Sequence, residues 1–164
     1  MVVGLRECEK VKHTIEELYR LEKRDDVTVQ GVVIDVRHGS GIVLRCKTCK
    51  RITTDCKCKV HGETETFADL RAKAVLDDGT GAMTLVIGKS AVEKLTGKTL
   101  AEIQKKAVER NDKDYAKDMF KEKLIARPLR VRGLVNVSDD FGILMVVREA
   151  DFFKPKVASD QAQG

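Results

Sequence analysis

Apolar side chains recur at every second position along much of the chain, and this pattern predicts a β-rich fold. The first long strand is predicted at 27–36, with apolar residues on both faces. Gly31 lies in the middle of this strand and indicates a bulge or a tight bend. A return strand starts at 42–44, and the second main strand is predicted at 68–76.

Three further strands complete the predicted sheet. The strand at 82–87 follows an Asp-Gly hairpin turn. The strands at 129–137 and 143–148 are joined by the turn at 138–142. Turns of this kind join neighbouring antiparallel strands, so the pattern favours a small sheet that curls on itself.

Helical spacing of apolar residues replaces the alternating pattern between 90 and 124. Ser90, three residues before a glutamate, predicts the start of a short helix that ends at Gly97. Thr99 begins a second helix in the same way, and a third is predicted from about Asp112. Their apolar stripes are expected to face the core. A short helix is also predicted after Thr14.

Four of the five cysteines lie close to one histidine in the sequence. Cys46 and Cys49 are separated by two residues, and so are Cys58 and His61. This spacing is typical of two knuckles that each turn two ligands onto one tetrahedral ion. We therefore predict a structural Zn²⁺ bound by these four residues, since four ligands leave no open position for catalysis.

Cys56 leaves alternatives open. It lies two positions before Cys58, so both would point to the same face of an extended strand. Cys58 is preferred, because only that choice leaves a gap of two residues before His61. Cys56 in place of the histidine would give four thiolates, a set that suits iron. A disulfide or free structural thiols are further alternatives. The clustering, with Cys8 left over, fits a reducing compartment.

The order of these elements predicts a mainly β fold with helices. It matches a five-stranded Greek-key barrel of the oligonucleotide/oligosaccharide-binding (OB) type, with the zinc knuckle inserted between strands 1 and 2 and the helices between strands 3 and 4. The expected organisation is an N-terminal helical extension (1–26), an OB domain (27–153, with the knuckle at 46–61) and a disordered tail (154–164).

The positive charge is concentrated around the knuckle. The chain has a formal net charge of +5, and the segment 45–61 has six cations against Asp55, which is also +5. Three thiolates and one Zn²⁺ would subtract a single unit. The loops at 37–67 and 138–142 flank the face on which OB folds hold single strands. A basic lobe at this place favours a polyanionic partner.

Five segments, in this order, resemble the zinc-containing OB domain of archaeal replication protein A, the single-stranded-DNA-binding protein. They are 39–46, 58–62, 69–81, 93–100 and 127–133. The resemblance covers about 27–150. It implies an inserted zinc ribbon with Cys46, Cys49, Cys58 and His61 as ligands, binding of single-stranded DNA in replication, repair and recombination, and association with other OB-fold subunits. The chain departs from the family in its single OB domain and its extra Cys56.

The candidate nucleic-acid contacts are cations and only two aromatic residues. Single-strand binders usually stack bases on aromatic side chains, and strand-borne aromatics are scarce here. We expect affinity to be mainly electrostatic. The predicted contacts are Arg45, Lys47, Lys50, Arg51, Lys57, Lys59, Arg71, Lys73, Lys89, Arg130, Arg132, Phe67 and Phe141.

Other functions compete with this interpretation. Gly88-Lys89-Ser90 imitates the end of a phosphate-binding loop, but that motif needs a glycine where Met83 stands, and we predict no enzymatic activity. An RNA-binding accessory module is one alternative. An assembly module that docks other OB-fold subunits through an apolar patch around Phe152 and Phe153 is another. Without a signal peptide or a long apolar run, we expect a cytoplasmic protein and no membrane partner. The resemblance to archaeal replication protein A implies an archaeal cell and association with the nucleoid.

Overall fold

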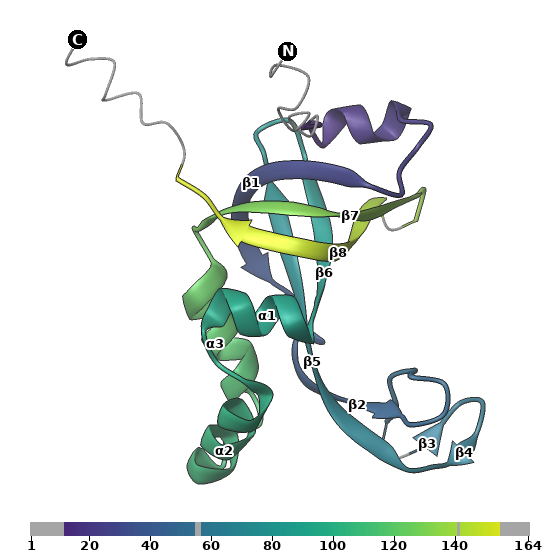
Figure 1. Cartoon of the computed structure of the whole chain (residues 1–164), viewed down its shortest axis with the longest axis vertical. Helices are drawn as coiled ribbons and strands as arrows, with labels where there is room; N and C mark the ends of the chain where they lie inside the picture. The colour runs from purple at the N-terminus through teal and green to yellow at the C-terminus, as the bar shows by residue number, and fades with distance from the viewer. Residues whose placement is uncertain (1–11, 55–56, 141, 155–164) are drawn as a thin grey trace, which may run out of the picture.

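The computed structural model describes residues 12–54, 57–140 and 142–154. Its main sheet has six strands, and these are the strands that the alternating pattern predicts, with small differences in their ends (Figure 1). They are β1 (Val27–Val36), β2 (Gly41–Cys46), β5 (Thr66–Asp77), β6 (Ala82–Gly88), β7 (Pro128–Ser138) and β8 (Gly142–Phe152).

Five of the strands close into a ring. The first half of β1 pairs with β7, and its second half pairs with β5. β5 pairs antiparallel with β6, and β6 pairs in parallel with β8. β8 pairs antiparallel with β7, which closes the ring. The buried residues of these strands face the inside of the ring, among them Val29, Leu85 and Met145. β2 pairs with the first part of β5, and the two strands extend together beyond the ring.

Three helices lie between β6 and β7 in the chain, where the sequence predicts helices. They are α1 (Lys89–Thr96), α2 (Leu100–Arg110) and α3 (Tyr115–Leu124). α3 buries Ala116, Met119, Phe120 and Leu124, as its apolar stripe predicts, and Ile103 is the buried residue of α2. The helices lie at one end of the barrel (Figure 1).

The predicted starts of the first two helices have different outcomes. The Thr99 side chain accepts a hydrogen bond from the backbone N–H of Glu102, so its predicted capping role is confirmed. The prediction for Ser90 is wrong, because α1 begins at Lys89 and its N-cap is Gly88. The extended backbone of Gly88 lets β6 run directly into the helix. The Glu93 carboxylate instead accepts a hydrogen bond from Leu100 N–H, at the start of α2.

The N-terminal segment docks against the β5–β6 hairpin. Residues Glu16–Arg20 form a 3₁₀ helix (η2), a tighter turn than the predicted α-helix. The Asp78 carboxylate accepts a hydrogen bond from Ile15 N–H at 2.8 Å, and Ile15 and Leu18 are buried. Tyr19 is 57% exposed. Among the described residues no helix combines the length and apolar character needed to cross a membrane.

Two glycines allow strands to approach closely where the ring bends. A Cβ on Gly31 would lie 2.6 Å from the carbonyl oxygen of Asp77, and one on Gly133 would lie 2.1 Å from that of Val146. The bulge expected at Gly31 lies further along β1, where its register with β5 shifts between Val33 and Asp35. Gly31 therefore serves the close approach of two strands.

Gly133→Ala is expected to lower the free energy of unfolding by about 2 kcal/mol, in the range of overpacked cores. The added methyl group collides with the backbone of β8 at the point where the β7–β8 register shifts. Chemical denaturation measures the change. Gly88→Ala is the control, because a Cβ there meets nothing within 4 Å. Equal stability of Gly133→Ala and the parent chain would contradict the close approach.

Candidate metal centre and nucleic-acid face

The extended ends of β2 and β5 carry a small lobe, which we call the Cys/His lobe and define as the described residues of 46–65. It contains the short strands β3 (Lys57–Cys58) and β4 (Gly62–Glu63), which pair with each other. The first knuckle closes through a hydrogen bond from Lys50 N–H to the Cys46 carbonyl oxygen at 2.8 Å. Lys50 adopts a left-handed conformation, with φ of 65°, to make this turn.

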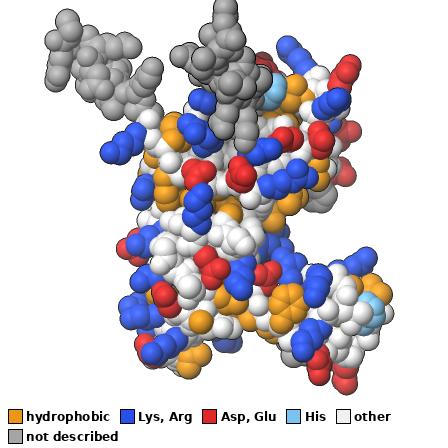
Figure 2. Space-filling model, viewed as in Figure 1, with side chains coloured by type: hydrophobic (Ala, Val, Ile, Leu, Met, Phe, Trp, Pro, Cys, Tyr) orange, Lys and Arg blue, Asp and Glu red, His pale blue; other side chains and the backbone are white. Residues whose placement is uncertain are grey.

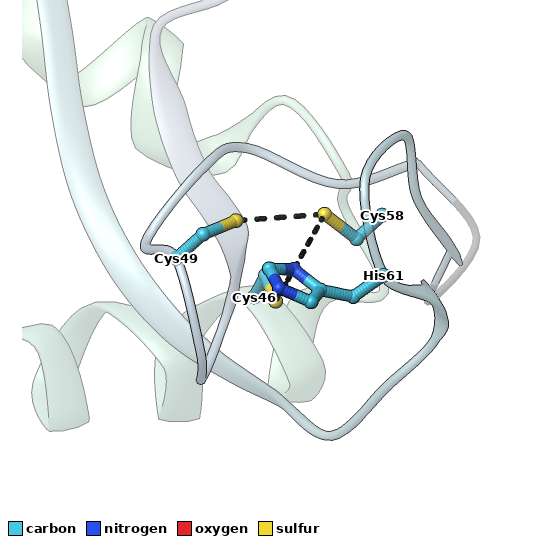
Figure 3. A group of neighbouring side chains, drawn as sticks. All are labelled: Cys46, Cys49, Cys58 and His61. Carbon is cyan, nitrogen blue, oxygen red and sulfur yellow. Dashed lines mark hydrogen bonds between the residues drawn. The ribbon is translucent and has the colours of Figure 1, made fainter.

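The lobe brings four candidate metal ligands together. The three Sγ atoms of Cys46, Cys49 and Cys58 and a ring nitrogen of His61 all lie within 4.8 Å of one another. Their side chains point toward one another from the two knuckles (Figure 3). Cys49 Sγ is 3.5 Å from Cys58 Sγ, and His61 Nδ1 is 3.7 Å from the sulfurs of Cys46 and Cys58. Cys56 lies outside the described residues.

These separations fit a tetrahedral ion. Metal–sulfur bonds of about 2.3 Å at the tetrahedral angle place two sulfurs about 3.8 Å apart, and a sulfur and a nitrogen slightly closer. The donor set has three soft thiols and one imidazole, which suits a transition metal. The four side chains could therefore hold a metal ion.

The packing of the lobe also depends on this cluster. The buried side chains among its described residues are Cys46, Thr53 and Cys58, whereas Ile52 and Val60 are 39% and 58% exposed. The described part of the lobe thus has no apolar core. Two of the four candidate ligands, Cys46 and Cys58, are buried, Cys49 is half-buried and His61 is exposed. Small domains without a core usually need a metal or disulfides for stability.

Backbone N–H groups stabilise the negative charge of two thiols. The N–H of Cys49 lowers the pKa of the Cys46 thiol to about 6; burial opposes this, and the Thr64 hydroxyl assists it. The N–H groups of Val60 and His61 lower the pKa of Cys58. Arg51 N–H also favours the Cys49 thiolate, but burial and the neighbouring thiols outweigh it and raise its pKa. A bound cation needs this thiolate form.

Several predicted nucleic-acid contacts share one face of β5. Arg71 and Lys73 alternate with the buried Leu70, Ala72 and Ala74 and so lie on the outward face. Phe67 is on the same face by the two-residue period of the strand, in the stretch of β5 that is half-buried throughout. Arg45 of β2 pairs with Phe67 in register and forms an ion pair with Asp69. The Lys50 ammonium lies 5.0 Å from the centre of the Phe67 ring. The face therefore runs from the barrel to the Cys/His lobe.

Two of the predicted cationic contacts, Arg71 on β5 and Lys47 in the lobe, also have structural partners. Both Nε and Nη2 of Arg71 donate to the carbonyl oxygen of Gly39, which ties β5 to the β1–β2 turn. Burial, helped by the positive charge of Arg45, lowers the pKa of Arg71. In the lobe, Lys47 pairs with Glu65 at 3.0 Å, and Lys47, Arg51, Lys57 and Lys59 are all exposed. Lys and Arg side chains lie on both sides of the recess between barrel and lobe (Figure 2).

The β5 face leads into a groove of about 600 Å³ on the outside of the barrel. Lys73, Arg37, His38 and Lys121 line it, against the single acid Asp35. Lys73 is predicted from the sequence, and the others are not. Arg37 and His38 directly follow the first strand, just before a glycine-rich turn, and this position next to the predicted loop could have indicated them. Nothing in the sequence indicates that Lys121 of α3 approaches β1.

The remaining predicted contacts lie elsewhere. Arg130 and Arg132 project from β7, where Arg132 forms ion pairs with Asp26 and Glu149. Lys89 is the first residue of α1. Phe141 lies outside the described residues. Phe152 and Phe153, considered for docking, are half-buried beneath cations, with Arg127 4.3 Å from the Phe152 ring and Arg130 5.8 Å from the Phe153 ring.

Comparisons with known proteins bear on the fold. No family model matches the chain, and no curated protein matches its sequence. A solved replication protein A heterotrimer bound to ssDNA has a similar structure, with a TM-score of 0.60 and 14% identity over 93% of this chain and 38% of that one. Yeast replication protein A bound to ssDNA gives a TM-score of 0.60 and 13% identity over 96% of both chains. The fold is OB-like.

A weaker likeness points to another class of protein. A crystal structure of a putative aspartyl-tRNA synthetase from Leishmania major has a TM-score of 0.45 and 13% identity over 96% of this chain and 23% of that chain. That score is too low to support a functional argument. The two replication protein A structures support the OB-like fold.

Proposed function

We propose that this chain binds single-stranded DNA without sequence preference, as a replication protein A-like subunit or domain with no enzymatic activity. The observation that carries the proposal is the continuous outward face of β5. It joins the groove at Lys73 to Phe67 and Lys50 beside the Cys/His lobe. An extended polyanion that lies along this face meets cations from both parts of the molecule.

The Cys/His lobe has a structural role in this proposal. Zn²⁺ bound by Cys46, Cys49, Cys58 and His61 would fix the two knuckles and thereby position the lobe cations. With four protein ligands no position would be left open for substrate, so the ion would have a structural role and no catalytic one. The hydroxyl of Thr64, which directly follows β4, lies 3.7 Å from Cys46 Sγ and supports that ligand.

The resemblance found in the sequence extends the proposal to its setting. It suggests a Greek-key barrel with an inserted zinc ribbon, an archaeal cell, a role in DNA replication, repair and recombination, and other OB-fold subunits as partners. The replication protein A heterotrimer bound to ssDNA, which has a similar fold, supports this direction.

Competition experiments test the choice of ligand. Unlabelled single-stranded DNA, duplex DNA and RNA of matched length are added to a complex of the protein with labelled oligothymidine. The proposal predicts that single-stranded DNA displaces the label at a concentration well below that of either competitor. Displacement by RNA at lower concentration would instead favour the RNA-binding accessory module.

A further inference from the structure

The outer surface of the barrel presents a stripe of aliphatic side chains that no predicted site explains. On β6, β8 and β7 the buried residues alternate with outward ones, and the outward ones include Val86, Val146 and Leu134. Val146 is 42% exposed, and Val86 and Leu134 are half-buried. We call these three residues, with Leu144, the aliphatic stripe.

The strand register places these side chains side by side. Val86 of β6 lies opposite Val146 of β8, and Val146 lies opposite Leu134 of β7. Leu144 is two residues from Val146, on the same face. Since neighbouring strands are about 4.8 Å apart, three strands give an apolar surface about 10 Å wide. This is room for the planar face of an unstacked base.

Cations border the stripe on one side. Lys73 of β5 lies opposite Val86, so one row across the sheet reads Lys73, Val86, Val146, Leu134. Leu144 and Lys73 also line the groove, together with Arg37 and His38. The apolar surface and the cationic groove are therefore continuous. A ligand with a charged backbone and flat apolar rings complements both parts.

We propose that the aliphatic stripe is the surface on which the bases of the single strand lie, while the phosphates follow Lys73 and the groove. The inference rests on the proposed function. It assigns to aliphatic side chains the contact with bases that strand-borne aromatic residues, scarce in this chain, usually make. Every base presents a flat face that aliphatic side chains can cover without hydrogen bonds to its edges, so this contact adds affinity without reading the sequence.

Leu134→Ser/Val146→Ser is expected to weaken binding of oligothymidine about tenfold, because it removes apolar area that the bases cover. The slope of log affinity against log salt concentration should stay unchanged, since the phosphate contacts remain. Val146→Thr, which keeps the shape of the side chain, should give about a threefold loss. Val108→Ser on α2 is the matched control, as Val108 is 79% exposed.

An abasic strand of the same length separates this inference from the function on which it rests. The parent chain should bind the abasic strand about as weakly as the double variant binds oligothymidine. On the abasic strand, the parent chain and the double variant should have equal affinity. If the parent binds abasic and base-bearing strands equally, or the variants bind oligothymidine like the parent, the stripe contacts no bases and single-strand binding still stands. If neither strand binds, both proposals fail.

Discussion

Cys49→Ser is expected to abolish metal binding and to unfold the Cys/His lobe while the barrel stays folded. The described lobe has no apolar core, and its buried side chains are two ligands and Thr53. Structural zinc contributes on the order of 10 kcal/mol to such small units, so the lobe should not fold without it. The ring of β1, β5, β6, β8 and β7 has its own core and should persist.

Metal content and amide hydrogen exchange measure the two parts of this prediction. The parent chain should contain one zinc per molecule and protect the amides of the lobe, and Cys49→Ser should lose both. Thr48→Ser, at the exposed neighbouring position, is the control and should keep the metal. Loss of protection throughout the barrel in Cys49→Ser would contradict an independently folded barrel.

Reversal of three lobe charges, Lys47→Glu/Arg51→Glu/Lys59→Glu, is expected to weaken binding of single-stranded DNA about a hundredfold at about 0.1 M salt. Each phosphate contact with a single strand contributes about 0.7 to the slope of log affinity against log salt, so three contacts contribute about 2. The logarithm of about 0.1 M is about −1, so the loss of about two slope units lowers the affinity about a hundredfold at this salt concentration. Titrations at several salt concentrations give the slope.

A matched variant tests whether position matters or only net charge. Lys98→Glu/Lys105→Glu/Lys106→Glu makes the same change in net charge on and before α2, away from the lobe (Figure 1). It should leave the slope near that of the parent chain. An equal fall in both variants would mean that the lobe is no part of the binding face.

The strands and the candidate ligands could be predicted because each depends on local sequence. The first strand is found at Val27–Val36, where the alternating pattern places it, and Cys46, Cys49, Cys58 and His61 meet as their spacing indicates. Thr99 caps α2 because the capping bond spans three residues. Signals of this kind need no knowledge of distant parts of the chain.

Features that depend on tertiary contacts could not be predicted. Gly31 and Gly133 are required by strands that are distant in sequence, and Lys121 reaches the groove only because α3 packs on β1 and β2. The aliphatic stripe requires the register of three strands. The failure at Ser90 has a different, local origin, because β6 continues into α1 without the turn that a capping serine usually follows.

Fluorescence anisotropy of a labelled oligothymidine, titrated with the protein at about 50 mM and about 200 mM salt, tests the central claim most directly. The account predicts saturable binding at the lower salt that weakens at least tenfold at the higher salt, with duplex DNA a poor competitor. Absence of binding at low salt, or displacement by duplex DNA as readily as by single strands, would contradict it.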